Sequence, residues 1–324
     1  MTDSQRQVGK SIHRQTGPTF YAATRLLPRD IREETYVLYG FCRITDEVVD
    51  GEDGRSPAAQ RRRLEELRRA ALGKSEAFHP VVDAFATLRR EVGIPDEEVN
   101  AFVDAMCTDI DTERYETYDD LATYMRGSAG AVGNMMTAIM GVRDESVRPH
   151  AMALGEAFQL TNFLRDVRED AEELGRVYLP EETLARFAIS AEDVLAGTTG
   201  PGLRRAVRWE LHRAEQRYRT GVAGIEELPA DCQFPVLLAA VLYAEHHRLI
   251  RRLDFDVRSS RPSLSTSRKA WVLGRTAWHW RACRDPVSVF RRVSPVPAEA
   301  EVPSGPRSGD GLGDDQLTKL PGPG

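Results

Sequence analysis

The sequence has few cysteines, and none of them is spaced for a metal site or a disulfide framework. The 324 residues include four, Cys42, Cys107, Cys232 and Cys283, without a CxxC pair. Isolated cysteines are typical of a reduced protein rather than a zinc-binding or disulfide-stabilised secreted one. We therefore expect a cytoplasmic protein.

Long apolar runs are also lacking. No stretch approaches the roughly 18 apolar residues of a membrane span, and Met1–Lys10 has no apolar core of a signal peptide. Aromatic residues make up only 7% of the chain, so residues that favour strands are scarce. No run alternates apolar and polar residues for long enough to predict a strand.

The charge balance argues against nucleic-acid binding. The net charge is −6 and the pI is near 5.8, whereas a nucleic-acid binder usually carries clustered basic residues. Arginine is abundant here but mixed with acidic residues. We expect no nucleic-acid partner, and the sequence does not indicate an oligomeric state.

Helical periodicity recurs along most of the chain. Val37, Phe41, Ile44 and Val48 share one helical face. Further helices are predicted at 59–72, 81–92, 96–110, 119–140, 148–171, 203–225, 234–255 and 267–280, with a stop and a new start around 94–96. The predicted fold is all-α, a single helical domain over residues 10–292.

The two ends are expected to lie outside this domain. Residues 1–9 are polar, and we expect a flexible N-terminus. Residues 295–324 contain six Pro and six Gly, which predicts a disordered tail over about 293–324.

Two acidic stripes are the first candidates for chemistry. Asp46 and Asp50 are four residues apart, and Asn162, Asp166 and Asp170 repeat the same spacing, so each set occupies one helical face. Carboxylates so placed repel each other. A divalent cation such as Mg²⁺, bound by one or two carboxylates with phosphate oxygens, would reverse the sign of that interaction.

A solvated helix face is the plain alternative for either stripe alone. Two stripes within apolar sequence instead indicate facing helices that hold Mg²⁺ around a diphosphate, with Arg165 and Arg168 placed for phosphate contacts. The segment 109–115 is interpreted as a polar helix end. The small residues of 124–133 indicate close helix packing, a groove for an apolar chain, or a local kink.

These motifs together resemble the squalene/phytoene synthase family over about residues 10–290. The resemblance rests on Tyr39–Gly51, Asn162–Asp170, Gly175–Pro180, Tyr124–Gly133 and Asp256-Val257 with Arg261. It implies an isoprenoid synthase-type helical bundle around a central cavity. It also implies head-to-head joining of two prenyl diphosphates through a cyclopropyl intermediate.

The resemblance also implies site residues. Asp46, Asp50, Asn162, Asp166 and Asp170 would bind Mg²⁺ (or Mn²⁺). Arg43, Arg165 and Lys269 would bind diphosphate, and Tyr124 would act with Arg43 and Arg165 in catalysis. The remaining expected substrate contacts are Tyr39, Arg114, Ala129, Val132, Met136, Phe158 and Tyr243.

This chain departs from the family pattern in three places. Arg168 stands where the family often has Gly, the stretch 171–175 is one residue longer, and Gly127 stands where a tyrosine is common. None of these changes removes an expected metal ligand. We therefore expect activity, with a changed loop near the second acidic motif.

Several alternatives stay open at this stage. The motif around Arg43–Gly51 is most similar to the phytoene-forming branch, which uses geranylgeranyl diphosphate and no NADPH. A squalene- or dehydrosqualene-forming enzyme acting on farnesyl diphosphate, a terpene cyclase and a non-catalytic relative are the alternatives. A di-iron bundle is disfavoured because His246 and His247 lack the required spacing, and both are expected on a helix surface. A lipid product is compatible with peripheral membrane contact, although no amphipathic anchor is obvious.

Overall fold

The computed structural model describes residues 10–11, 18–51 and 54–298. Within these ranges it contains helices and no strand, and its one isolated bridge pairs Arg114 with Val177. The all-α prediction is therefore confirmed. No helix in the described ranges is both long enough and apolar enough to cross a membrane.

The α-helices are α2 (Pro18–Thr24), α3 (Arg29–Asp50), α4 (Pro57–Ala71), α5 (Pro80–Val92), α6 (Asp96–Thr108), α7 (Tyr118–Met125), α8 (Ala131–Ile139), α9 (Arg148–Glu169), α10 (Glu181–Arg186), α11 (Ala191–Leu195), α12 (Pro201–Ala223), α13 (Ala230–Arg252), α14 (Thr266–Cys283) and α15 (Pro286–Val293). Short 3₁₀ segments occur at η2 (Glu145–Val147) and η4 (Gly224–Glu227), and π-helical segments at η1 (Arg126–Gly130) and η3 (Asp170–Leu174).

The predicted helix boundaries agree with these bounds within about four residues. The predicted stop near residue 94 is present: α5 is followed by Gly93 in the left-handed region, and Pro95 precedes α6. Periodicity does not predict α2, α10, α11 or α15. These helices have 5 to 8 residues, too few turns for a repeat to show.

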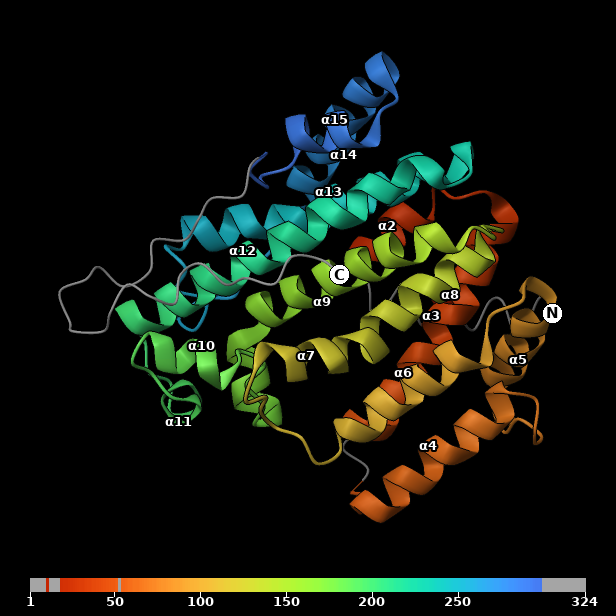
Figure 1. Ribbon diagram of the computed structural model, residues 1–324, viewed down its shortest axis with the longest axis horizontal. Helices are drawn as coiled ribbons and strands as arrows, with labels where there is room; N and C mark the ends of the chain where they lie inside the picture. The colour runs from red at the N-terminus through yellow and green to blue at the C-terminus, as the bar shows by residue number, and fades with distance from the viewer. Residues whose placement is uncertain (1–9, 12–17, 52–53, 299–324) are drawn as a thin grey trace.

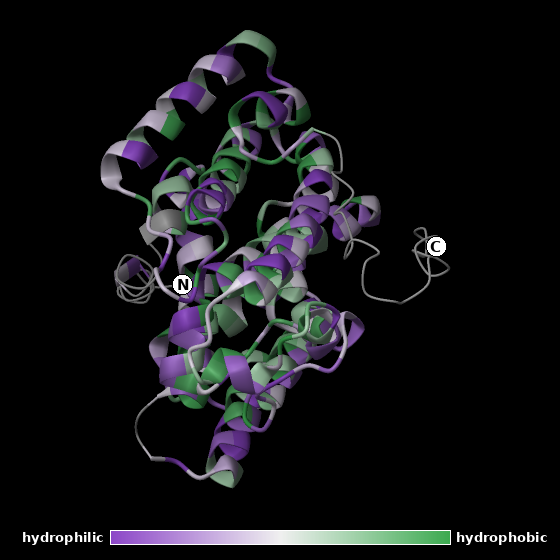
Figure 2. Ribbon diagram, turned by 90° about the vertical axis from the view of Figure 1, so that its left-hand side faces the viewer, coloured by the Kyte–Doolittle hydropathy of each residue, from purple (hydrophilic) through white to green (hydrophobic). Residues whose placement is uncertain are grey.

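Helix α9 lies at the centre of the bundle (Figure 1). It packs along α12 and also contacts α8, η1 and α13. Many helices carry hydrophobic and hydrophilic residues side by side along the ribbon (Figure 2), as expected when one face is buried. The amphipathic pattern of α3 shows this directly, because Val37, Phe41 and Val48 are all buried.

Close helix packing explains the small residues of 124–133. A Cβ on Gly127 would lie 2.5 Å from the carbonyl oxygen of Ala101 on α6, and one on Gly133 would lie 2.4 Å from that of Ala151 on α9. Both glycines are therefore required where backbones meet. The predicted local irregularity is also present, since η1 interrupts the predicted helix with π-helical geometry.

The longer stretch after the second acidic motif forms η3. Its five residues continue α9 as a π-helical turn, which ends at Gly175 in the left-handed region. A π turn takes up one additional residue without breaking the helix. Arg168 is half exposed and pairs with Glu172 at 3.1 Å, so it faces solvent.

Two expectations from the sequence need correction. The prediction that His246 and His247 lie on a helix surface is wrong, because their exposed fractions are 4% and 0%. The prediction of a disordered tail is wrong for its first residues, because Val293 and Val296 are buried in the core near α12 and α13. Residues 1–9 and 299–324, predicted to be flexible or disordered, lie outside the described residues.

Candidate active site

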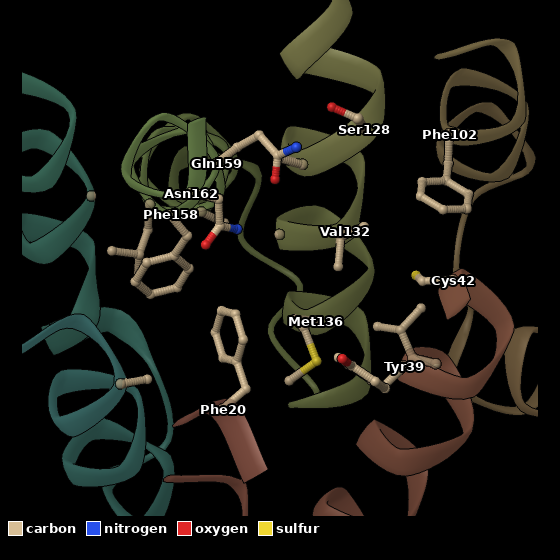
Figure 3. A pocket seen from close by; sticks show the side chains of 18 of the residues that line it. Phe20, Tyr39, Cys42, Phe102, Ser128, Val132, Met136, Phe158, Gln159 and Asn162 are labelled. Atoms are coloured by element: carbon tan, nitrogen blue, oxygen red, sulfur yellow. The ribbon is translucent and has the colours of Figure 1, made fainter. Parts of the chain in front are cut away.

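A cavity of about 560 Å³ runs through the centre of the bundle. Figure 3 shows side chains from several helices pointing into it: Phe158, Gln159 and Asn162 from α9, Ser128 from η1, Val132 and Met136 from α8, Tyr39 and Cys42 from α3, and Phe20 from α2. The lining also includes Pro235, Val236 and Ala239 of α13. The cavity therefore depends on helices from both halves of the chain.

The cavity has a polar end and an apolar end. Along α9 and the residues that flank it, the lining changes from Val147 and Leu154 to Asp166 and Asp170. The order is reversed along the α7–α8 segment, where Tyr124 contacts Asp109 at the polar end and Met140 clusters with Val147 and Leu154 at the apolar end. The lining residues follow the whole length of α9, from Val147 just before its start to Asp170 just after its end, a distance of about 34 Å at about 1.5 Å per residue.

The first acidic stripe lies on α3 at the polar end. Asp46 and Asp50 both line the cavity, and Arg43 approaches Asp46 at 3.8 Å. Burial raises the pKa of Asp46 to about 7; Arg43 opposes this shift, and neighbouring Asp50 and Asp109 add to it. Burial and the neighbouring carboxylates therefore disfavour the charged form of Asp46, even though Arg43 lies beside it.

The second acidic stripe lies across the cavity on α9 and η3. Nε of Arg165 donates to Oδ1 of Asp166 at 2.8 Å, and Nε of Arg261 donates to the same oxygen at 2.9 Å. Burial raises the pKa of Asp170 to about 8, with further increases from Asp166 and Glu169. Asp166 is therefore paired with two arginines, whereas Asp170 forms no ion pair with the residues that the structure describes.

Asp109 joins the polar end, which corrects the interpretation of 109–115 as an ordinary helix end. It lines the cavity and is 7% exposed. The hydroxyl of Tyr124 donates to its Oδ2 at 2.7 Å. Burial raises the pKa of Asp109 to about 6, against the hydrogen bond from Tyr124, which lowers it. No spacing in the sequence relates Asp109 to the two stripes.

Arg176 is a second residue without an assigned role in the sequence analysis. It donates to Oδ1 of Asp50 at 2.9 Å and to the backbone oxygen of Asp109 at 2.8 Å. Nearby, the ring of Tyr178 stacks on Phe163 with centroids 4.0 Å apart. Arg176 and Tyr178 both belong to the Gly175–Pro180 motif, and this motif could have identified them from the sequence.

The polar end has oxygen atoms that suit the coordination of a divalent cation. Among the described residues, Oδ1 of Asn162 and Oδ1 of Asp109 are buried without a hydrogen-bond partner. Burial also raises the pKa values of Asp46 and Asp170, so a bound cation would favour their charged forms. Hard oxygen ligands of this kind suit Mg²⁺. In the described residues, no three His, Cys, Asp or Glu side chains form a compact preformed cluster. Mg²⁺ commonly takes only one or two carboxylates together with phosphate and water.

Most of the predicted site residues line this one cavity. They are Tyr39, Arg43, Asp46, Asp50, Tyr124, Ala129, Val132, Met136, Phe158, Asn162, Arg165, Asp166 and Asp170. Three predicted residues do not line it: Arg114 pairs with Glu192, Lys269 lies on α14, and Tyr243 lies behind the wall. The ring of Tyr243 packs 4.3 Å from Phe20 and 4.9 Å from Phe158, so its contact with the cavity is indirect.

Comparisons with known proteins agree with this geometry. The family model for squalene/phytoene synthase matches residues 13–268. A phytoene synthase from Arthrospira platensis is 35% identical, covering 82% of this chain and 89% of that protein. A 15-cis-phytoene synthase from Paracoccus is 34% identical, covering 82% and 88%. A dehydrosqualene synthase crystallised with a ligand superposes with a TM-score of 0.77 at 26% identity, covering 86% of this chain and 97% of that one.

Proposed function

The chain belongs to the squalene/phytoene synthase family, and from this membership we propose that it joins two geranylgeranyl diphosphates head to head to form phytoene. One observation carries the proposal. A single cavity joins two facing acidic stripes with arginines at one end to a long apolar channel at the other. That division matches a substrate with a diphosphate head and a hydrocarbon tail.

The arginines of the polar end bind and orient the diphosphate groups. Arg43 and Arg165 line the cavity, and Arg261 pairs with Asp166 at its edge. A guanidinium forms charge-assisted hydrogen bonds with phosphate oxygens. Asp46, Asp50, Asn162, Asp166 and Asp170 would hold Mg²⁺. Bound Mg²⁺ would supply Lewis-acid activation of the diphosphate leaving group.

The aromatic residues next to the polar end stabilise positive charge. Tyr124, Phe163 and Tyr178 line the cavity and contact one another, with Tyr178 stacked on Phe163. The face of an aromatic ring attracts a cation, so these rings are placed to stabilise an allylic or cyclopropylcarbinyl carbocation. The Tyr124 hydroxyl, held by Asp109, is placed to move or hold a proton. The apolar walls exclude water that would otherwise capture the cation.

Two observations favour a C20 over a C15 substrate. The curated relatives named above, at 34–35% identity, form phytoene. The cavity lining continues along α9 from Asp170, just after the helix, to Val147, just before it, which supports a long prenyl chain. The similarity to a dehydrosqualene synthase at 26% identity keeps farnesyl diphosphate as the alternative substrate.

Product analysis by mass spectrometry tests the proposal. The purified chain is incubated with Mg²⁺ and geranylgeranyl diphosphate, and separately with farnesyl diphosphate with and without NADPH. Asp50→Ala and Asp166→Ala serve as inactive controls. We expect a C40 hydrocarbon from the first mixture alone, without NADPH, and its loss in both controls.

The other outcomes separate the alternatives. A C30 product from farnesyl diphosphate, without a C40 product, would preserve the coupling reaction and overturn the substrate. A cyclised product of one diphosphate would replace coupling with cyclisation. Folded protein without any product would indicate a non-catalytic relative.

A further inference from the structure

The outer face of α14 carries an exposed aromatic surface. Trp278 is 76% exposed and Trp271, seven residues earlier, is 47% exposed, so the two indoles project from the same face of the helix. On that face Gly274 lies between the two tryptophans and Ala282 lies beyond Trp278, and both residues are also exposed. The opposite face of α14 is buried through Val272, Thr276 and Trp280, so the helix is already anchored.

Basic residues surround these tryptophans. Segment 266–293, which forms α14 and α15, contains seven Lys and Arg residues and one acidic residue. Its local net charge is therefore +6 in a chain whose net charge is −6. Of these seven residues, only Arg268 forms a salt bridge within the described part of the chain, with Glu245. The acidic residue, Asp285, caps α15 by accepting from the backbone amides of Val287 and Ser288.

Two of the arginines lie against the indole of Trp271. The guanidinium carbon of Arg268 is 4.0 Å from the ring centroid, and that of Arg275 is 5.1 Å from it. These cation–π contacts hold positive charge beside an exposed ring. We call the surface formed by Trp271, Arg275, Trp278 and Arg281 the α14 basic–aromatic face.

We propose that the α14 basic–aromatic face docks the protein on an anionic lipid bilayer. Tryptophan favours the boundary between headgroups and acyl chains, and clustered Lys and Arg are attracted to anionic lipids. A helix that combines both on one face binds in the plane of that boundary. Charge complementarity decides the occupant: a bilayer with anionic headgroups offers the opposite charge to the +6 segment.

A second copy of this chain fits the surface less well. In a two-fold dimer the same patch contacts itself, which would place two strongly basic segments against each other. Like charges that meet in this way oppose association. Self-association is therefore an alternative outcome of the test rather than the expected one.

The position of α14 fits this role. Helices α14 and α15 form a hairpin at the top of Figure 1, outside α12 and α13. The face of α13 turned away from α14 contributes Pro235, Val236 and Ala239 to the apolar end of the cavity. A docked α14 would thus bring the wall of the hydrocarbon channel near the membrane. This inference goes beyond the proposed function and does not require it.

Vesicle flotation with the full chain tests the proposal. The vesicles contain phosphatidylcholine alone, or phosphatidylcholine and phosphatidylglycerol at roughly three to one. We expect about tenfold or greater preference for the anionic vesicles at low salt, and loss of binding at high salt. Trp278→Ala and Arg281→Glu should each weaken binding severalfold. Indole emission should shift to the blue on binding, and less so in Trp278→Ala.

Matched variants elsewhere on the surface serve as controls. Phe78 is 44% exposed on the segment before α5, and Arg62 is exposed on α4, so Phe78→Ala and Arg62→Glu change similar chemistry away from α14. Equal losses in these controls would overturn the assignment of the surface. Absence of binding to either vesicle would overturn the proposal itself.

Two further measurements complete the test. A dimer that dissociates in Trp278→Ala, seen by light scattering without vesicle binding, would assign the surface to self-association instead. Product formation in detergent, where no membrane is needed, should be unchanged in Trp278→Ala. Failure of the proposed function would appear in that detergent assay and leave the vesicle result unaffected.

Discussion

The hydroxyl of Tyr124 donates a hydrogen bond of 2.7 Å to the carboxylate of Asp109. Tyr124 lies on α7, and Asp109 directly follows α6, so the segment between them must fold back to bring the two together. Burial raises the pKa of Tyr124 well above its usual value, and the nearby Asp109 carboxylate adds to the shift. The phenol is therefore held neutral, with its proton directed at Asp109.

Asp109→Asn should lower kcat by about 100-fold, because it removes the charged acceptor while preserving the shape of the side chain. Tyr124→Phe should produce a similar loss. If the two residues act as one unit, the double variant should lose little more than either single variant. Steady-state kinetics with geranylgeranyl diphosphate measures this, with circular dichroism as the check on folding. Losses that multiply in the double variant would contradict a shared role.

Stability in the absence of metal should fall as the pH rises from about 6.5 to 8. The folded-state pKa values of Asp46 and Asp170, about 7 and about 8, are raised above the unfolded value. In this window the folded state binds more protons than the unfolded state, so deprotonation of the two carboxyl groups costs stability, together about 2 kcal/mol. Urea unfolding in EDTA at several pH values measures the slope.

The raised pKa values of Asp46 and Asp170 also predict how Mg²⁺ changes the stability of the protein. The ion should raise the unfolding midpoint more at pH 8 than at pH 6.5, since it replaces the protons that the carboxylates have lost. Asp170→Asn should flatten the pH dependence in EDTA and reduce the gain from Mg²⁺. A slope that stays the same in this variant would show that other groups control it. The histidines His246 and His247 titrate below this window, because burial lowers their pKa values.

A buried network behind the second acidic stripe should govern stability. Nδ1 of His247 lies 3.3 Å from Glu215, its Nε2 lies 2.9 Å from the Thr161 hydroxyl, and Arg251 donates to Glu215 at 2.6 Å. Glu215→Ala leaves buried partners uncompensated and should cost about 3–5 kcal/mol in the free energy of unfolding. Glu226→Ala, at an exposed position, should change it by less than about 0.5 kcal/mol. Urea denaturation compares the two; equal effects would rule out the network.

Narrowing the channel should change the preferred chain length. Val132 projects into the cavity from α8 (Figure 3), and Val132→Phe would fill space needed by the longer prenyl tail. We expect the ratio of C30 to C40 products to rise by at least about tenfold when both substrates are supplied, since the contacts of even one methylene in a hydrophobic pocket contribute about 1–3 kcal/mol. Val132→Ala should retain the C40 product. An equal fall in both products would place Val132 away from the tail.

The longer helices and much of the site were predictable from the spacing of apolar and acidic residues along the sequence. The spacing of Asp46 and Asp50, and of Asn162, Asp166 and Asp170, fixes which side chains share a face once each segment is helical. The predicted cavity residues come almost entirely from helices whose periodicity is long and regular. Short helices such as α10 and α11 were not predictable, because one or two turns owe their stability to packing rather than to a repeat.

The sequence by itself determined the helical class, the two oxygen-rich stripes and the small residues between them, since each is set by neighbours within a few turns. Only the tertiary structure decided that Asp109 and Arg176 complete the polar end, that His246 and His247 are buried, and that Arg114 lies outside the cavity. The physical reason is burial. The charge and contacts of a carboxylate or an imidazole depend on whether it is buried and which partner lies beside it. Both are set by helices that are distant in the sequence.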